Sequence, residues 1–112
     1  PLVSSSAASD VYKRQSLLHP DHYVLQVKGN SMIDEHIHDG DYIVAKKSRT
    51  ARPGQIVVAL INGEATLKCY VDGVNGVELH PRNPDFPIIK VESKDDFHIN
   101  GVLLYSFRNY LN

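Results

Sequence analysis

Two residues of this sequence have the types and settings that covalent chemistry requires. Ser31 lies at the corner of a small-residue turn, within the run Val27-Lys28-Gly29-Asn30-Ser31-Met32-Ile33. A serine hydroxyl is a poor nucleophile unless a neighbouring base removes its proton. Lys68 is the candidate base, because it stands alone in a mostly apolar stretch where burial could lower its pKa and leave the amine neutral. Together, the two residues could form a Ser-Lys dyad.

Each residue also has an ordinary structural interpretation. Ser31 could be a turn serine that hydrogen-bonds its own backbone. Lys68 could be a solvated lysine at the edge of a sheet. For a serine or lysine considered singly, these are the commoner roles, so the surrounding sequence must decide between the two interpretations.

Short strands must position these two side chains. Apolar and β-branched stretches predict strands at residues 23–27, 42–45, 55–61, 64–71, 77–80 and 88–91, and further strands within 97–107. We expect this last segment to be interrupted at Asn100-Gly101. Asn62-Gly63 is a strong hairpin signal, so the strands on either side of it should pair antiparallel. Strand alternation then places Thr66 and Lys68 on one face.

The segment that carries Ser31 is predicted to be a turn containing a single helical turn. Asp39-Gly40-Asp41 supplies the bend after it, and we interpret both carboxylates as structural turn residues. Met32 could be a core residue or could line a substrate groove beside Ser31. Its assignment to the groove is the prediction that a structure can test.

Composition indicates a single soluble domain. The chain has 112 residues, 42% of them hydrophobic and 22% charged, which is enough for one core. A formal net charge of −1 gives no electrostatic argument for nucleic-acid binding by this chain. A single cysteine excludes an internal disulfide, and no apolar run approaches the length of a membrane span. We therefore expect a cytoplasmic protein.

Several ordered motifs resemble those of self-cleaving repressors of the LexA type. They are Gly29-Asn30-Ser31-Met32, Asp39-Gly40-Asp41, residues 54–59, Glu64-Ala65-Thr66-Leu67-Lys68, residues 77–84, Ile99-Asn100-Gly101-Val102 and Arg108. Ser31 precedes Lys68 by 37 positions, the separation associated with that family. The resemblance covers roughly residues 23–110 and favours the catalytic roles of both residues.

The resemblance implies a mostly β fold, the partly open, LexA/signal-peptidase-like β-barrel of short antiparallel strands. It also implies an acyl-transfer mechanism with Ser31 as nucleophile and Lys68 as base, and oxyanion donors at the backbone N–H groups of Asn30 and Ser31. No cofactor is required. A homodimer, stimulation of self-cleavage by the RecA filament, and DNA binding only through an N-terminal domain absent from this chain are further expectations.

The first part of the chain departs from this pattern. Residues 1–15 are rich in Ser and Ala and begin with proline, so we expect a disordered or foreign leader there and the peptidase and dimerisation domain over residues 16–112. LexA-type repressors cut themselves at a small-residue bond, usually Ala-Gly, N-terminal to the serine. Neither Ala-Gly nor Cys-Gly occurs between Pro1 and Ser31. The dyad could therefore be intact in a chain that cannot cut itself.

Other functions remain open from the sequence alone. A UmuD-like mutagenesis protein or a phage repressor would have the same motifs, and so would a non-catalytic dimerisation module. The pairs His19/His22 and His36/His38 have spacings that a metal ion could use. No cysteine or carboxylate cluster completes such a site, so we assign no metal.

Overall fold

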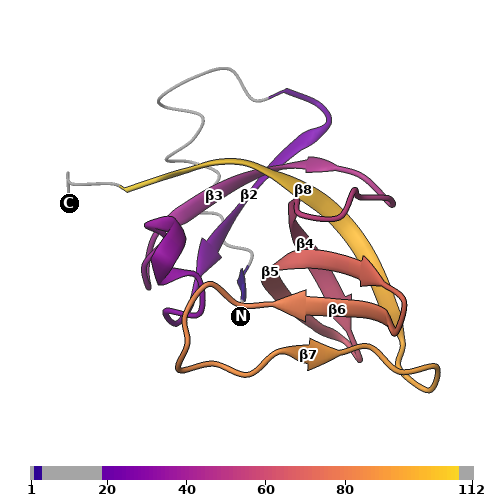
Figure 1. The fold of residues 1–112 in the computed structure, drawn as a ribbon. Coiled ribbons are helices and arrows are strands. Elements are labelled where there is room, and N and C mark those ends of the chain that lie inside the picture. Colours follow the sequence, from indigo (N-terminus) through magenta and orange to yellow (C-terminus); the bar gives the residue numbers. More distant parts are fainter. Residues whose placement is uncertain (1, 4–18, 109–112) are drawn as a thin grey trace.

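The computed structural model describes residues 2–3 and 19–108, and within them the chain is almost entirely β-structure (Figure 1). The elements are β1 (Leu2–Val3), β2 (His22–Val27), the 3-10 helix η1 (Ile33–Glu35), β3 (Tyr42–Lys47), β4 (Ile56–Ile61), β5 (Glu64–Gly73), β6 (Gly76–His80), β7 (Ile89–Lys90) and β8 (Phe97–Phe107). The single helical turn after Ser31 is thus confirmed. No helix among these residues is long and apolar enough to cross a membrane.

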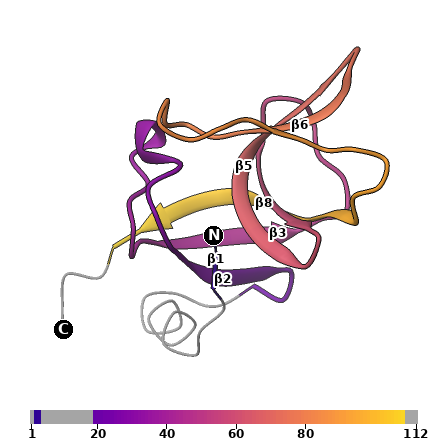
Figure 2. The ribbon, with the colours of Figure 1, turned by 90° about the horizontal axis from the view of Figure 1, so that it is seen from below.

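The strands form one antiparallel sheet in the order β1-β2-β3-β8-β4-β5-β6-β7. The sheet is strongly curled but does not close. Figure 2 shows how strongly β5 bends along its length. This arrangement confirms the predicted mostly β, partly open fold. In the order of the sheet, β8 lies between β3 and β4.

The hairpin between β4 and β5 sets the position of Lys68. Asn62 and Gly63 have φ angles of 51° and 83°, which a tight two-residue hairpin turn requires and which asparagine and glycine adopt most readily. The pairing of Ile61 with Glu64 places Lys68 opposite Val57. The predicted hairpin is therefore confirmed.

The predicted interruption at Asn100-Gly101 is wrong, because β8 runs unbroken from Phe97 to Phe107. The pairing of β8 with β4 shifts by one residue at this point, so Asn100 is bulged out of register. A Cβ on Gly101 would lie 2.3 Å from the hydroxyl oxygen of Tyr23. Glycine therefore serves the close packing of Tyr23 against the strand, not a turn.

Buried side chains form two main clusters on the curled sheet. One contains Leu2, Val27, Met32, Ile37, Ile43, Ala45, Val58 and Leu67. The other contains Val57, Ala59, Tyr70, Leu79 and Ile99. Because Met32 belongs to the first cluster, the turn that carries Ser31 is anchored to the core by the residue that follows it.

Of the predicted leader, residues 1–15, the structure describes only Leu2 and Val3. These two residues pair with Val27 and Gln26 of β2, and Leu2 is 7% exposed within the core. The strand pairing and the burial of Leu2 offset the entropy lost on ordering these two residues, and the disordered or foreign leader stays a prediction. The rest of the predicted leader and its boundary at residue 15 lie outside the described residues.

Candidate active site

Ser31 is held in a turn whose two ends are tied together. Gly29 has a φ of 86°, which glycine adopts without strain. Its N–H donates to the Asp39 carboxylate at 2.7 Å, and the N–H of Asp39 donates to the Asn30 side-chain oxygen at 2.9 Å. Ser31 lies within this turn, and 7% of its surface is exposed. Asp39 thus has the structural role that the sequence predicted.

Asp41 joins the same turn to the last strand. Its carboxylate accepts hydrogen bonds from the His38 N–H at 2.8 Å and from the Arg108 guanidinium at 2.7 Å. Asp41 is buried, so this charge is neutralised by a partner on the segment that follows β8. The carboxylate is occupied in holding the turn, as expected for a structural residue.

Lys68 reaches Ser31 from the middle of β5. The Lys68 Nζ lies 3.0 Å from the Ser31 Oγ, 2.6 Å from the Thr66 Oγ1 and 3.2 Å from the backbone oxygen of Leu67. The lysine is 5% exposed. The predicted meeting of Ser31 and Lys68 in space is therefore confirmed. A neutral amine at this distance could accept the serine proton.

Burial sets the proton affinity of the lysine. Loss of water contact lowers the pKa of Lys68, and the negative charge of Glu64 opposes this by raising it. The net direction is downward, which increases the neutral fraction at a given pH. The structure thus supplies the environment that a lysine needs to act as a general base.

Backbone donors beside Ser31 are available for an oxyanion. The N–H groups of Asn30, Ser31 and Met32 donate no hydrogen bond to any residue within the described part of the chain. Donors fixed before the reaction begins stabilise the charge that develops on a carbonyl oxygen. The two amides predicted from the sequence, those of Asn30 and Ser31, are therefore open to such a contact.

A cavity of about 190 Å³ lies directly against the dyad. Its lining combines the reactive polar groups with an apolar wall, and consists of Ser31, Glu64, Thr66, Lys68, Phe86, Pro87 and Ile89. Phe86 and Pro87 of this wall lie in the segment between β6 and β7, and Ile89 lies in β7 itself.

Met32 does not line this cavity. Its side chain is 1% exposed and packs in the core with Val27, Ile37 and Leu67. The sequence-based assignment to the substrate groove is therefore corrected to a core position. The physical reason is that this large apolar side chain is stabilised by removal from water into the core cluster.

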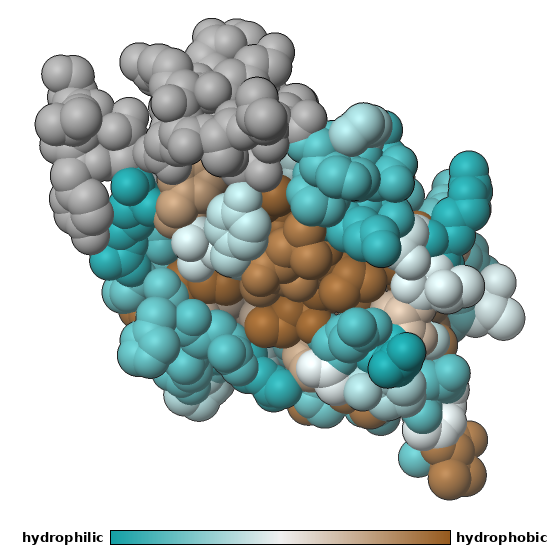
Figure 3. Space-filling model, turned by 90° about the horizontal axis from the view of Figure 1, so that it is seen from above, coloured by the Kyte–Doolittle hydropathy of each residue, from teal (hydrophilic) through white to brown (hydrophobic). Residues whose placement is uncertain are grey.

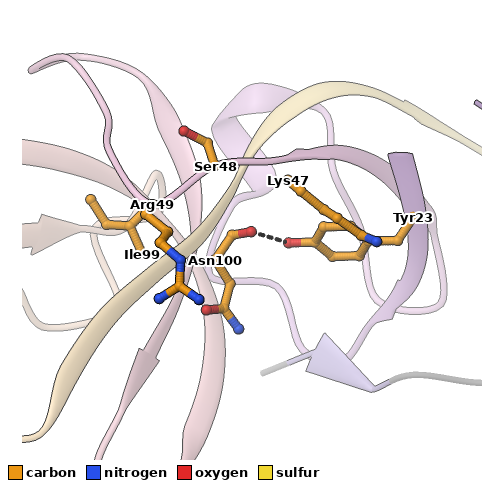
Figure 4. Close-up of a pocket in the computed structure, with 6 residues that line it drawn as sticks. All are labelled: Tyr23, Lys47, Ser48, Arg49, Ile99 and Asn100. Atoms are coloured by element: carbon orange, nitrogen blue, oxygen red, sulfur yellow. Dashed lines mark hydrogen bonds between the residues drawn. The ribbon is translucent and has the colours of Figure 1, made fainter. Parts of the chain in front are cut away.

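A larger cavity, of about 440 Å³, lies away from the dyad (Figure 4). It is lined by Tyr23, Lys47, Ser48, Arg49, Ile99 and Asn100. Figure 4 shows the Tyr23 hydroxyl directed at the backbone oxygen of Asn100, to which it donates at 3.1 Å. Burial raises the pKa of Tyr23 to about 12, so this phenol stays protonated at neutral pH and serves packing.

The histidine pairs form no metal centre in the described chain. No three histidine, cysteine, aspartate or glutamate residues gather there in a way that could hold a metal ion. His19 and His22 instead stack with ring centroids 4.5 Å apart.

Comparison with known proteins identifies the family. A model of the Peptidase S24-like family matches residues 3–104, which is most of the chain. The chain belongs to this family.

The relatives of this Peptidase S24-like chain confirm the resemblance inferred from its motifs. It is 47% identical over 90 residues to the LexA repressor of Syntrophotalea carbinolica, a match covering 80% of this chain and 45% of that protein. It is 37% identical over 111 residues to the LexA repressor of Paracidovorax citrulli, covering 97% of this chain and 50% of that protein. The chain thus spans about half the length of these curated relatives.

Sequence reasoning missed two groups at the site of this S24-like chain. Thr66 contacts the lysine amine, and strand alternation had already placed it on the same face as Lys68. The other group is Arg82-Asn83. Asn83 contacts Asn30 across 53 positions of sequence, and Arg82 contacts Ser31 from a similar distance along the chain. No local pattern predicts such a contact, although both residues lie in one of the motifs that carry the resemblance.

Glu64 provides a test of the electrostatics around Lys68. Replacing Glu64 with glutamine should lower the pKa of Lys68 further, because the negative charge that raises it is removed. Cleavage of an added peptide that contains an Ala-Gly bond should become faster near neutral pH. The increase should be less than about tenfold, since Glu64 is exposed and its charge is screened by salt. The rates of the two proteins should converge at alkaline pH.

The measurement is the pH–rate profile at low and high salt, with Glu92→Gln as the matched control at an exposed site that does not act on Lys68. A Glu64→Gln profile that coincides with the unmutated one at low salt would contradict the electrostatic interpretation.

Proposed function

We propose that this chain is the self-cleaving serine peptidase domain of a LexA-type repressor, with Ser31 as nucleophile and Lys68 as general base. The observation that carries the proposal is the buried contact of 3.0 Å between the Lys68 Nζ and the Ser31 Oγ. A solvated strand lysine would not be 5% exposed, and a serine with only a turn role would not face an amine.

The reaction begins with proton transfer. Neutral Lys68 takes the proton of Ser31 as the serine oxygen attacks a peptide carbonyl carbon, giving a tetrahedral oxyanion. The Asn30 and Ser31 N–H groups face that oxygen. The Lys68 ammonium then gives its proton to the leaving amine, and an acyl-serine remains. A water molecule, deprotonated by the neutral lysine, releases the acyl group and regenerates Ser31.

Thr66 has a supporting role in this mechanism. Its hydroxyl and the carbonyl of Leu67 lie 2.6 and 3.2 Å from the lysine amine, within hydrogen-bond distance. A long, flexible side chain held at two points loses less entropy when it reacts. With these two contacts made, the third hydrogen-bond direction of the amine is toward the Ser31 oxygen.

The partners belong to this proposal as well. The resemblance implies a homodimer, stimulation of cleavage by RecA filaments, a cytoplasmic location and DNA contact through a separate N-terminal domain. Leu104 and Tyr105 of β8 are large hydrophobic side chains that are 44% and 45% exposed. Figure 3 shows an apolar area bordered by polar residues on the upper face of the molecule. Such an area favours contact with a second protomer.

Cleavage of an added peptide tests the proposed activity. No Ala-Gly bond occurs between Pro1 and Ser31, so a peptide with a LexA-type Ala-Gly bond is supplied in trans. We expect slow cleavage near neutral pH, faster cleavage at alkaline pH, and none with Ser31→Ala. Equal cleavage by the unmutated protein and Ser31→Ala, or no cleavage at any pH, would favour a non-catalytic dimerisation module.

A further inference from the structure

The orientation of the Ser31 N–H is fixed through the other end of its own peptide group. The carbonyl of Asn30 and the N–H of Ser31 belong to one planar unit and point in opposite directions. Any group that holds the Asn30 oxygen therefore aims the Ser31 N–H. The same relation connects the Ser31 oxygen to the N–H of Met32.

The segment between β6 and β7 supplies both of these anchors. The Asn83 side-chain amide donates to the Asn30 oxygen at 2.8 Å, and the Arg82 N–H donates to the Ser31 oxygen at 2.8 Å. The Asp34 N–H donates in turn to the Arg82 oxygen at 2.8 Å. Figures 1 and 2 both show this segment passing beside η1 and the turn before it. Two consecutive peptide planes at the nucleophile are thus held from outside the turn, and within the turn the Asn30 oxygen accepts only a longer bond, from the Ile33 N–H at 3.3 Å.

Asn83 is itself held in one orientation. Its side-chain oxygen accepts a hydrogen bond from the Asp85 N–H at 2.9 Å, so its amide nitrogen is the end that faces Asn30. The neighbouring Arg82 contacts the Cys69 sulfur at 3.1 Å and Glu35 at 3.3 Å. Because Cys69 follows Lys68 on β5, the segment that holds the serine turn is also attached beside the base.

We propose that Asn83 is a positioning residue that aims the Ser31 N–H at the oxyanion. The inference rests on the proposed peptidase function and deepens it. A donor on the Asn30 oxygen fixes the plane of the peptide and polarises it, which strengthens the hydrogen bond that the Ser31 N–H donates. This bond strengthens as negative charge develops on the substrate oxygen, so its loss affects the transition state more than the bound peptide.

The test compares Asn83→Asp and Asn83→Ala with the unmutated protein, using the Ala-Gly peptide. Asn83→Asp keeps the acceptor for Asp85 and replaces only the donor to Asn30. We expect kcat to fall about tenfold in both variants, less than the 10²–10³-fold cost of deleting a direct oxyanion donor. KM should remain unchanged, because the cavity wall is untouched. The midpoint of the pH–rate profile should also remain unchanged in Asn83→Ala, whereas the negative charge added in Asn83→Asp should raise the pKa of Lys68 and move the midpoint upward.

A peptide aldehyde separates positioning from a merely structural role. It forms a tetrahedral adduct with Ser31, and its affinity should fall in parallel with kcat in both Asn83 variants. Affinity for the uncleaved peptide, measured in the Ser31→Ala background, should not change. Asn62→Gly is the matched control, because it removes another asparagine with two side-chain hydrogen bonds at a positive φ that glycine tolerates.

The outcomes are distinct. If the unmutated protein cleaves the peptide and Asn83→Asp keeps the same kcat, the role of Asn83 is overturned while the dyad stands. The role is equally overturned if activity falls only in proportion to folded protein, or if aldehyde affinity stays constant. If the unmutated protein does not cleave at all, the proposed function itself has failed.

Discussion

Replacing Lys68 with alanine should reduce peptide cleavage by about 10²–10⁴-fold, the range that a general base contributes. The amine lies 3.0 Å from the Ser31 oxygen, and no other side chain among the described residues hydrogen-bonds that oxygen. Lys68→Arg should not restore activity, because a guanidinium does not deprotonate in the accessible pH range. Initial rates measured from pH 6 to pH 10 provide the check.

Lys68→Met is the control for folding. It fills similar space without a charge, so it should be inactive yet folded. If Lys68→Ala cleaved at the unmutated rate, with the same rise at alkaline pH, another residue would be the base. Rates that are flat with pH in the unmutated protein would also contradict the role of Lys68.

The same lysine makes stability depend on pH. Burial lowers its pKa in the folded state, so between that value and about 10.4 the unfolded chain holds more protons. The cost to folding is complete below the folded-state pKa and disappears as pH rises through this interval. Lys68→Met should therefore be more stable than the unmutated protein near neutrality, and this advantage should shrink as the solution becomes alkaline.

Replacing Met32 with alanine should lower the free energy of unfolding by ~2–5 kcal/mol, the usual cost of truncating a large core side chain. Met32 is 1% exposed and packs against the cluster that contains Val27, Ile37 and Leu67. Urea denaturation followed by intrinsic fluorescence gives the value, with a shifted midpoint and an unchanged slope. Val74→Ala, at a fully exposed position, should leave the midpoint in place.

This substitution also distinguishes the two roles considered for Met32. If Met32 lined the groove, replacing it with alanine would raise KM and leave the free energy of unfolding nearly unchanged. If Met32 is a core residue, the substitution lowers the free energy of unfolding. It then affects the reaction only by loosening the turn at Ser31. An unfolding midpoint equal to that of the unmutated protein would return Met32 to the groove.

Local sequence patterns predicted the strands and the hairpin because their causes are local. Asn62-Gly63 determines a turn by its own backbone preferences, and alternation along β5 determines which side chains share a face with Lys68. The order of the sheet could not be predicted in this way. Placing β8 between β3 and β4 depends on packing among segments that are distant in the sequence.

Packing among distant segments also explains where the sequence-based predictions differ from the structure. Asn100-Gly101 has the composition of a turn, yet Tyr23 packs over the glycine and the strand continues. Met32 lies beside the nucleophile in sequence but faces the core. Leu2 lies in a segment without periodicity and is nonetheless buried against β2. In each case, a tertiary contact outweighs the local preference.

The central place of β8 determines when this active site can first exist. Ser31 belongs to the part of the sheet with β2 and β3, and Lys68 to the part with β4 and β5. Among the strands that the structure describes, only β8 joins these parts by strand pairing. A nascent or refolding chain that has not yet inserted β8 has both reactive residues but leaves an unpaired edge on each half. Pairing between strands that are distant in the sequence is slow. The alignment of Ser31 with Lys68 across the sheet therefore depends on β8, and a chain folded only in its two halves has both reactive residues without an assembled dyad.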